Sequence, residues 1–376
     1  MIWILLSSFF IATVLTLAVI KLTRSAGNSW SDHDLSGPQK MHSHVVARIG
    51  GVGIFGGFLA GLFAQYWLHP NEWLSILLCV VCALPAFAFG LVEDITKSVS
   101  PRRRLAATML SGLLGYYLLD ASVHRTAVPP LDLLLTFPVV SVAVTLLVVA
   151  GVANSINIID GMNGLASMCS VLMLIGLTYI SNQVGDTLIS GLSLAVVGAV
   201  FGFFMWNYPR GLVFLGDGGA YFLGFMVAEL GILLVQRNPS VSPIAPLLLV
   251  AYPVWETIFT MYRRRVLRGR PMTMPDGIHL HTLLYRRLMR WAVGSTDAVA
   301  LTRGNSMTSP YLWVLCSLSV VPSVLWWDNT PVLFIALAVF VVFYIHVYWL
   351  IVRFRTPKWL LKFETDVNNN IQNRTK

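Results

Sequence analysis

Charged side chains are scarce in this chain. Asp, Glu, Lys and Arg make up 11% of its 376 residues, whereas soluble domains average about 25%. Hydrophobic residues make up 56%, the mean hydropathy is +0.72, and the apolar runs leave no room for a soluble domain between them. The composition therefore excludes an ordinary soluble protein and indicates a polytopic membrane protein. The net charge of +9 is then explained by basic residues flanking membrane helices, and no nucleic acid partner is expected.

Cysteine is also rare, and its placement excludes a disulfide framework. All four cysteines lie inside apolar runs. The CVVC pair, Cys79 and Cys82, has the spacing of a redox or zinc motif, but no other ligand residue lies beside it. We therefore expect all four to be small apolar packing residues. The apolar N-terminal run, residues 2–20, is too long for a signal-peptide core and lacks a cleavage site, so we expect a retained membrane span.

Apolar runs near the 20 residues that a bilayer requires recur along the whole chain. We predict an all-α protein with about eleven transmembrane helices, near residues 2–21, 49–68, 74–92, 104–119, 136–153, 165–181, 187–206, 218–236, 243–262, 309–327 and 331–352. The run at 104–119 is the weakest of these.

The basic residues orient this arrangement. With the N-terminus outside, 24 of the 26 Lys and Arg residues fall on the inner face, and only Arg125 and Arg237 fall outside. Such asymmetry predicts a cytoplasmic C-terminus. We expect one transmembrane domain, residues 1–352, with a cytoplasmic tail at 353–376 and cytoplasmic loops at 22–48, 93–103, 154–164, 207–217 and 263–308.

Four acidic residues stand at predicted cytoplasmic helix ends: Glu93, Asp94, Asp160 and Asp217. One acid in such a place often caps a helix or pairs with an arginine. Ionisable groups at membrane depth are costly, however, and four of them on one face indicate a functional site. Two other polar residues inside spans, Glu229 and His346, are expected to be satisfied packing partners.

The segment NSINIIDGMNGL, residues 154–165, adds amide oxygens to these carboxylates. Asn154 and Asn157 share a helical face, and Gly161 is expected to end the helix so that Asp160 and Asn163 turn toward the same cavity. Carboxylates and amides without cysteine and histidine spacing favour Mg²⁺, or alternatively Mn²⁺, with positions left for substrate phosphates. The segment is therefore predicted to line a site for a metal and a phosphorylated ligand.

Basic and histidine residues on the same face suit such a ligand. They are Lys40, His42, His44 and Arg48 in the first loop, and Arg270, His279 and His281 in a later loop. Histidines two residues apart do not share a helical face, so HLH at 279–281 suggests a loop or irregular turn. Hydrogen bonding to phosphate or sugar is the preferred role, because no third zinc ligand is evident. Most arginines of the run RRRVLRGR, 263–270, are expected to anchor the chain at anionic lipid.

Five motifs in order resemble the polyprenyl-phosphate N-acetylhexosamine-1-phosphate transferases, which are related to the phospho-N-acetylmuramoyl-pentapeptide translocase. The resemblance covers residues 33–290 and rests on Lys40 and His42 with RIGG (48–51), Glu93-Asp94, NSINIIDGMNGL, FLGDGGA (214–220) and HLHT (279–282). The sequence departs from the family pattern at Val45, Ala47, Glu93, Asn163, Ala220 and Thr282. Asn163 replaces an aspartate, so it can bind ligand but cannot act as a base.

The resemblance implies a Mg²⁺-dependent enzyme that transfers an N-acetylhexosamine 1-phosphate from a UDP-sugar to undecaprenyl phosphate and releases UMP. It further implies a bacterial inner-membrane protein whose active site faces the cytoplasm. Magnesium is assigned to Asp217, Asn157 and Asp160. Asp94 is the first candidate for a general base, with Glu93 and Asp160 behind it. The predicted substrate contacts are Lys40, His42, Arg48, Asn154, Asn157, Asn163, Arg270, His279 and His281.

Several alternatives stay open at this point. A transporter of a phosphorylated or anionic solute also places polar motifs in a membrane, but its groups need access from both faces. HLHT favours a UDP-N-acetylhexosamine over a UDP-peptide donor without identifying the sugar or the glycan pathway. The sequence also leaves open a direct or a two-step reaction through a carboxylate nucleophile, and a monomer or a homodimer.

Overall fold

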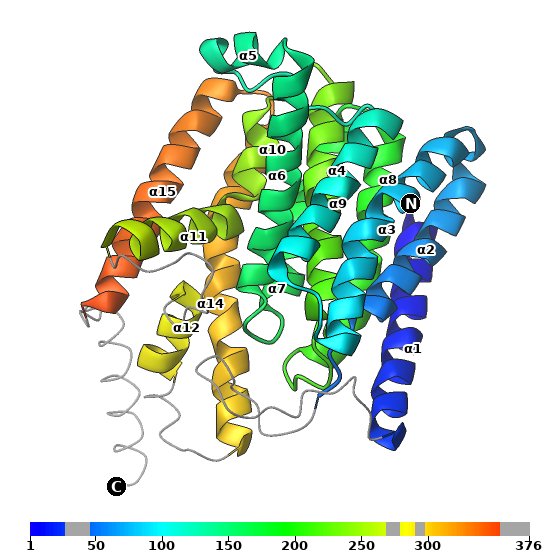
Figure 1. The fold of residues 1–376 in the computed structure, drawn as a ribbon, viewed down its shortest axis with the longest axis vertical. Helices are drawn as coiled ribbons and strands as arrows, with labels where there is room; N and C mark the ends of the chain where they lie inside the picture. Colours follow the sequence, from blue (N-terminus) through cyan, green and yellow to red (C-terminus); the bar gives the residue numbers. More distant parts are fainter. Residues whose placement is uncertain (27–45, 268–278, 290–297, 354–376) are drawn as a thin grey trace, which may run out of the picture.

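A computed structural model describes residues 1–26, 46–267, 279–289 and 298–353 as a bundle of helices (Figure 1). In these residues the only β-type pairing is an isolated bridge between Ala47 and Val213. The helices are α1 Ile2–Ala26, α2 Gly51–Leu68, α3 Trp73–Thr96, α4 Pro101–Leu118, α5 Pro129–Leu135, α6 Pro138–Ile159, α7 Leu165–Gln183, α8 Thr187–Asn207, α9 Gly216–Arg237, α10 Ile244–Leu249, α11 Ala251–Tyr262, α12 Leu280–Leu284, α14 Ala298–Leu325 and α15 Thr330–Val352.

Nine helices in the described part of the chain are long and apolar enough to cross a membrane. They are α1, α2, α3, α6, α7, α8, α9, α14 and α15. An all-helical polytopic membrane protein is thereby confirmed, while the count of eleven, the outside N-terminus and the single-domain boundaries stay predictions. The predicted span at 104–119 corresponds to α4, which ends at Leu118 and whose 18 residues include three arginines in the first turn.

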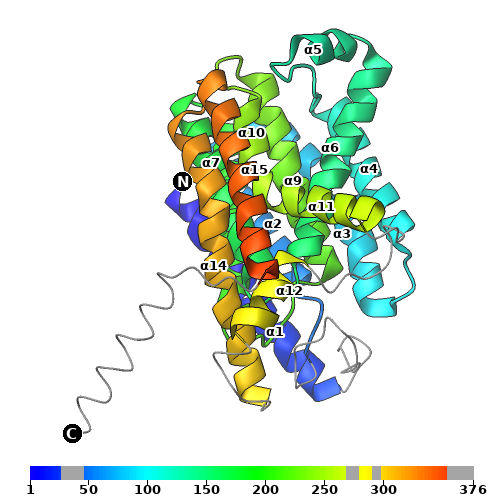
Figure 2. The same cartoon turned by 90° about the vertical axis from the view of Figure 1, so that its left-hand side faces the viewer.

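The predicted span at 243–262 is not one continuous helix. It breaks at Val250 into α10 and α11. Pro253 explains the break, because its ring collides with the carbonyl four residues earlier, that of Leu249, and it has no N–H to donate. After the break, α11 lies across the upright helices (Figures 1 and 2).

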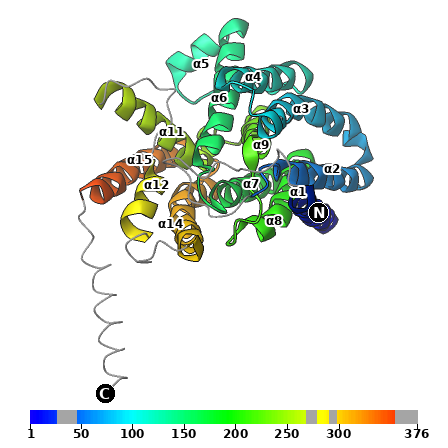
Figure 3. The same ribbon diagram turned by 60° about the horizontal axis from the view of Figure 1, so that its bottom comes forward.

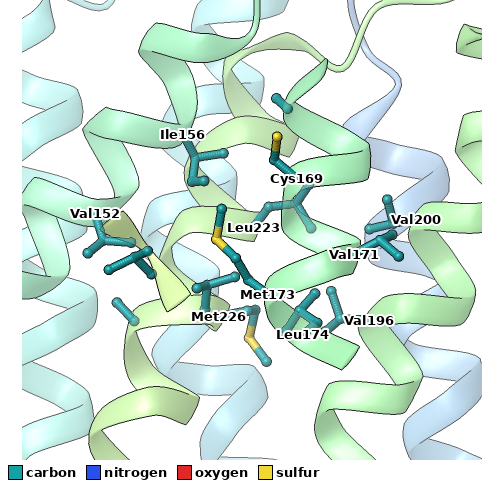
Figure 4. Close-up of a cluster of buried hydrophobic side chains, with 14 of the residues drawn as sticks. Val152, Ile156, Cys169, Val171, Met173, Leu174, Val196, Val200, Leu223 and Met226 are labelled. Atoms are coloured by element: carbon teal, nitrogen blue, oxygen red, sulfur yellow. The ribbon is translucent and has the colours of Figure 1, made fainter. Parts of the chain in front are cut away.

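Helix α9 occupies the centre of the bundle (Figure 3). It is buried throughout its apolar window and contacts α2, α3, α4, α6, α7, α8 and α10. Side chains of α6, α7, α8 and α9 interlock in the core cluster of Figure 4, which includes Ile156, Met173, Val200 and Leu223. All four cysteines are buried and free, as expected for packing residues. Burial on all sides fixes the position of both ends of α9.

The two basic residues outside the predicted inner set both lie at the C-terminal end of α9. One Arg125 nitrogen donates to the carbonyls of Val235, Asn238 and Val241, at 2.9, 3.0 and 2.8 Å. Arg237 pairs with Asp186 at 2.7 Å. Cations at this end compensate unpaired carbonyls and the negative pole of the helix dipole. Asp217 belongs to the first turn of the same helix, so these residues lie at the opposite end from it.

A close contact between α3 and α9 depends on glycine. A Cβ atom placed on Gly90 would lie 2.6 Å from the Cα of Gly218. Gly90→Ala is therefore expected to push the helices apart and to destabilise the protein by about 1–3 kcal/mol. The measurement is the midpoint of thermal unfolding in detergent.

Gly151→Ala is the matched control, because a Cβ atom there meets nothing within 4 Å. Gly151 also lies inside a helix, α6, so this change should leave the midpoint unchanged or raise it. An equal fall in both variants would show that the contact between Gly90 and Gly218 is not the cause.

Candidate active site

The first loop and the start of α9 are joined through their backbones. The N–H of Phe214 donates to the carbonyl of Ala47 at 2.8 Å, and the N–H of Gly50 donates to the carbonyl of Phe214 at 3.0 Å. Gly51 donates in the same way to Leu215 at 3.0 Å. These bonds bring RIGG, 48–51, against FLGDGG, 214–219. Two motifs far apart in the sequence therefore form one structure.

Gly216 is the turn residue at this junction. Its φ of +74° lies in the left-handed region, which favours glycine. A Cβ atom there would collide with the carbonyl oxygen of Arg48 and lie 2.5 Å from the carboxylate of Asp94. The glycine thus allows both the conformation and the close approach that the start of α9 requires.

Asp94 caps α9 from a neighbouring helix. Its two carboxylate oxygens accept the N–H groups of Asp217 and Gly218, each at 2.8 Å, and its side chain is only 2% exposed. The residue before α9, Leu215, supplies no side-chain cap, so Asp94 satisfies donors that the helix itself leaves unpaired. The carboxylate also faces the positive pole of the helix dipole. Asp94 therefore fixes the backbone that carries Asp217.

Asp217 is the point where four helices meet. Its Oδ1 accepts from Nδ2 of Asn157 at 3.0 Å, and its Oδ2 forms an ion pair with Arg104. The guanidinium of Arg104 also lies over the ring of Tyr221, 5.8 Å from its centroid. Residues of α4 and α6 therefore hold the carboxylate of Asp217 on α9, and Asp94 of α3 holds its backbone N–H.

Arg104 was not among the predicted site residues. It belongs to the triplet Arg102–Arg104, which follows Glu93-Asp94 by only a few residues. The sequence signal was therefore present, but a run of arginines at a helix start is also what a cytoplasmic flank looks like. Only the packing of α4 against α9 distinguishes Arg104 from its neighbours.

Asp160 ends α6, as the position of Gly161 predicts. Its side chain is half-buried, and burial raises the pKa of its carboxyl to about 7, an effect that the guanidinium of Arg48 opposes. The carboxyl also lies within electrostatic range of Asp94. A carboxyl in this setting is stabilised in its charged form by a further cation.

The segment HLHT, 279–282, is called the histidine loop here, and it begins at the cap of α12. His279 is the residue before the helix, with a φ of −62° and a ψ of 153°. The loop or irregular turn predicted for HLH is found only at His279, because Leu280 and His281 already belong to α12. The rings of His279 and His281 stack with centroids 5.3 Å apart and planes 5° apart. Nδ1 of His279 lies 3.2 Å from Glu256 and 3.3 Å from Thr260.

His281 lies against the turn after α6. A Cβ atom on Gly161 would stand 2.6 Å from its Nε2, so the missing side chain admits the ring. The side chain is 4% exposed, and its Nδ1 has no hydrogen-bond partner among the residues described here. Burial, with a contribution from His279, lowers the pKa of His281 to about 3. A neutral imidazole with an unpartnered nitrogen binds through a hydrogen bond rather than through charge.

Three further predicted residues have local roles in this structure. Asn163 is buried, its N–H donates to Asn305 of α14 at 2.8 Å, and its Nδ2 donates to the carbonyl of Pro209 at 3.3 Å. Oε2 of Glu93 accepts the N–H of Val99 at 2.7 Å and closes the turn after α3. Asn154 is half-buried on α6, one turn before Asn157. Their ligand-binding and catalytic roles stay predictions.

Three predicted substrate residues, Lys40, His42 and Arg270, lie outside the described residues. Within residues 46–267, 279–289 and 298–353, no group of three or more His, Cys, Asp and Glu side chains could hold a metal ion. The predicted set of Asp217, Asn157 and Asp160 is of another kind, because it mixes carboxylates with an amide. The donor chemistry fits Mg²⁺, which needs only one or two carboxylates besides phosphates and water. Rotating the Asn157 amide would present its oxygen beside Asp217.

Known proteins match the part of the chain that contains these acids. Residues 74–235 match the family model described as Glycosyl transferase family 4, and this segment contains Asp94, Asp160 and Asp217. The chain is 27% identical over 295 residues, 77% of its length and 79% of the relative's, to a probable undecaprenyl-phosphate N-acetylglucosaminyl 1-phosphate transferase of Bacillus subtilis. A Thermotoga maritima undecaprenyl-phosphate alpha-N-acetylglucosaminyl 1-phosphate transferase is 25% identical, with 77% and 82% covered.

A second group of relatives carries another name. The phospho-N-acetylmuramoyl-pentapeptide-transferase of Streptococcus thermophilus is 28% identical over 230 residues, which cover 59% of this chain and 67% of the relative. Residues 74–235 therefore match glycosyl transferase family 4, and the chain is a distant homologue of the undecaprenyl-phosphate N-acetylglucosaminyl 1-phosphate transferases and the phospho-N-acetylmuramoyl-pentapeptide transferases.

Proposed function

We propose that this membrane enzyme transfers an N-acetylhexosamine 1-phosphate from a UDP-sugar to undecaprenyl phosphate. An oxygen of the lipid phosphate bonds to the β-phosphorus of the UDP-sugar. The bond from that phosphorus to the bridging oxygen breaks, and UMP leaves with that oxygen. The lipid-linked sugar diphosphate remains in the bilayer. The enzyme would act at the cytoplasmic face of a bacterial inner membrane.

One observation carries this proposal: Asp217, Asn157 and Arg104 meet at the start of α9, with Asp94 beneath them. Phosphoryl transfer requires mainly positioning of the phosphates and stabilisation of their charge. Carboxylates, an amide and an arginine held by buried helices supply both. Transport is not proposed, because these groups gather at one end of α9.

Magnesium belongs to the proposal, with Asp217, Asn157 and Asp160 as the residues that would hold it. Bound there, it would neutralise the charge of the diphosphate. Arg104 would then lie beside the same phosphates, as a fixed cation paired with Asp217. Arg48 and, beyond the described residues, Lys40, His42 and Arg270 are proposed to bind phosphate oxygens as well.

Asp94 is given a different role from the general base that the sequence suggested. Both of its oxygens already accept backbone N–H groups, so taking up a proton would weaken the bonds that hold the start of α9. A phosphate monoester has a second pKa of about 6, and the dianionic lipid phosphate can attack without a base. We therefore assign Asp94 to positioning, and propose direct displacement.

The proposed donor is UDP-N-acetylglucosamine or a close N-acetylhexosamine relative. The names of the Bacillus subtilis and Thermotoga maritima relatives support the glucosamine form. His281 supports a sugar or nucleotide contact through a hydrogen bond, because it is buried and neutral.

The direct test is an assay of purified protein with labelled UDP-N-acetylglucosamine and undecaprenyl phosphate, with and without Mg²⁺. Label that becomes lipid-soluble, with equal release of UMP and dependence on Mg²⁺, is the expected result. If no member of a UDP-N-acetylhexosamine panel yields UMP, while protein in vesicles moves an anionic solute across the membrane, the transferase proposal is wrong.

Asp217→Asn should reduce kcat by on the order of 10²–10³-fold, the cost of removing one fixed electrostatic group at a transition state. The substitution keeps the shape of the side chain but removes the charge that faces Arg104. The measurement is the UMP release rate, together with the thermal unfolding midpoint to verify folding.

Asp120→Asn is the control for Asp217→Asn. Asp120 accepts from Gln236, near the other end of α9, and asparagine tolerates its φ of 57°. This variant should keep the normal rate. Normal turnover of Asp217→Asn with unchanged Mg²⁺ dependence would remove Asp217 from the site.

His281→Ala should act on donor use. Loss of one hydrogen bond to a neutral group costs about 0.5–1.5 kcal/mol, so kcat/KM for the UDP-sugar should fall about two- to thirteenfold. The KM for undecaprenyl phosphate should not change. Steady-state kinetics with each substrate varied in turn measure both, and unaltered constants for the UDP-sugar would make the loop purely structural.

A further inference from the structure

A buried glutamate that no sequence motif indicated holds the histidine loop. Glu256 lies on α11, after the break at Val250, and is 1% exposed. The sequence shows it as a lone acid in the run YPVWETIF, 252–259. Such an acid is costly in an apolar setting unless its oxygens are bonded.

Both oxygens of Glu256 accept hydrogen bonds. Oε1 accepts the backbone N–H of Leu280 at 3.1 Å and lies 3.2 Å from Nδ1 of His279. Oε2 accepts the hydroxyl of Tyr344 at 2.5 Å, and Thr260 donates to Oε1 at 3.5 Å. These neighbours are donors, which is the environment that an ionised carboxylate requires.

The donors come from three separate elements. Leu280 is the first residue of α12, so Glu256 caps that helix as Asp94 caps α9. Tyr344 belongs to α15, most of which faces away from the bundle. Its ring also packs edge-on against Phe259 of α11, with centroids 5.7 Å apart. Glu256 therefore ties α11, α12 and α15 together.

Burial alone does not account for these bonds. Glu229, on α9, is 0% exposed, yet neither of its oxygens has a hydrogen-bond partner among the described residues. The prediction that Glu229 is a satisfied packing residue is wrong in this respect. Of the two glutamates, only Glu256 forms hydrogen bonds among the described residues, and one of these holds the start of α12.

We infer that Glu256 and Tyr344 are positioning residues for donor binding, because together they fix His279 and the start of α12 and so hold His281 against Gly161. The inference rests on the proposed function. The path runs from Tyr344 to Glu256, from Glu256 to His279, and through the stacked rings to His281.

The hydrogen bond also fixes the tautomer of His279. A carboxylate only accepts, so Nδ1 of His279 carries the proton toward Glu256. Nε2 is then the nitrogen left for a ligand or for water. A partner that orients a ligand-binding histidine in this way commonly matters almost as much as the histidine itself.

The test is a double-mutant cycle between Glu256→Ala and His279→Ala, with kcat/KM measured for the UDP-sugar and for undecaprenyl phosphate. Displacing a site residue by about an ångström can lower the rate on the order of 10²-fold. In Glu256→Ala this loss should appear in kcat/KM for the UDP-sugar and not in kcat/KM for undecaprenyl phosphate. In protein that already carries His279→Ala, adding Glu256→Ala should lower kcat/KM for the UDP-sugar by less than about a further twofold.

Two milder variants accompany the cycle. Tyr344→Phe removes only the hydroxyl and keeps the ring contact with Phe259, so it should show a smaller loss of the same kind. Glu256→Gln keeps one acceptor oxygen and should recover part of the activity. If Glu256→Ala does not fold, the cycle is measured with Glu256→Gln. Glu229→Gln is the matched control, an equally buried acid, and should leave both kinetic constants unchanged.

Independent losses that multiply in the double mutant, or losses shared equally by both substrates, would overturn the inference. Failure of the wild-type protein to make UMP would instead refute the proposed function. A second readout is independent of turnover: the ¹⁵N spectrum of the histidine side chains, with His279 assigned from His279→Gln. The protonated Nδ1 signal should persist in Glu229→Gln and be lost in Glu256→Ala, and its persistence in both would also overturn the inference.

Discussion

The hydrogen bonds from the start of α9 to Asp94 are the constraint on which the site depends. A helix end buried in a bundle leaves N–H groups that water cannot reach. Here α3 supplies a carboxylate that accepts two of them, and the contact between Gly90 and Gly218 allows α3 to come close enough. The next charged group along the helix, Asp217, is then held beside Asn157 and Arg104. The capping of α9 by Asp94 thus determines the position of the Asp217 carboxylate.

Two buried acids, Asp94 and Glu256, share one arrangement, and the buried Glu229 differs from both. Asp94 and Glu256 each cap a helix that carries site residues, and each is bonded at both oxygens. Such bonds offset the cost of placing a carboxylate in apolar surroundings. Glu229 has no such partners among the described residues, and its contact is with Gly115 of α4. The two bonded acids support two parts of the proposed site: Asp94 holds the start of α9 that carries Asp217, and Glu256 holds the start of α12 and His279.

The sequence predicted the helical class and the helix end at Gly161, because apolar runs and glycines are local signals. It could not predict that Asp94 caps α9 while the carboxylate of Asp217 faces Asn157 and Arg104. The two acids look alike in the sequence, and only the packing of α3 against α9 distinguishes them. Arg104 was hidden in a run of arginines, and Glu256 was overlooked as a lone acid. The break before α11 was signalled by Pro253, but an apolar run of span length outweighed it.

The central claim, that Asp94 acts by holding Asp217 rather than by chemistry of its own, has a direct test. Mn²⁺ binding to the wild type and to Asp94→Asn can be measured by titration calorimetry, beside the Mg²⁺ dependence of the rate. Loosening the support of a metal ligand should weaken Mn²⁺ binding about tenfold or more, and saturating Mg²⁺ should restore most of the rate. Unchanged Mn²⁺ binding with a rate that stays low at every Mg²⁺ concentration would contradict the account.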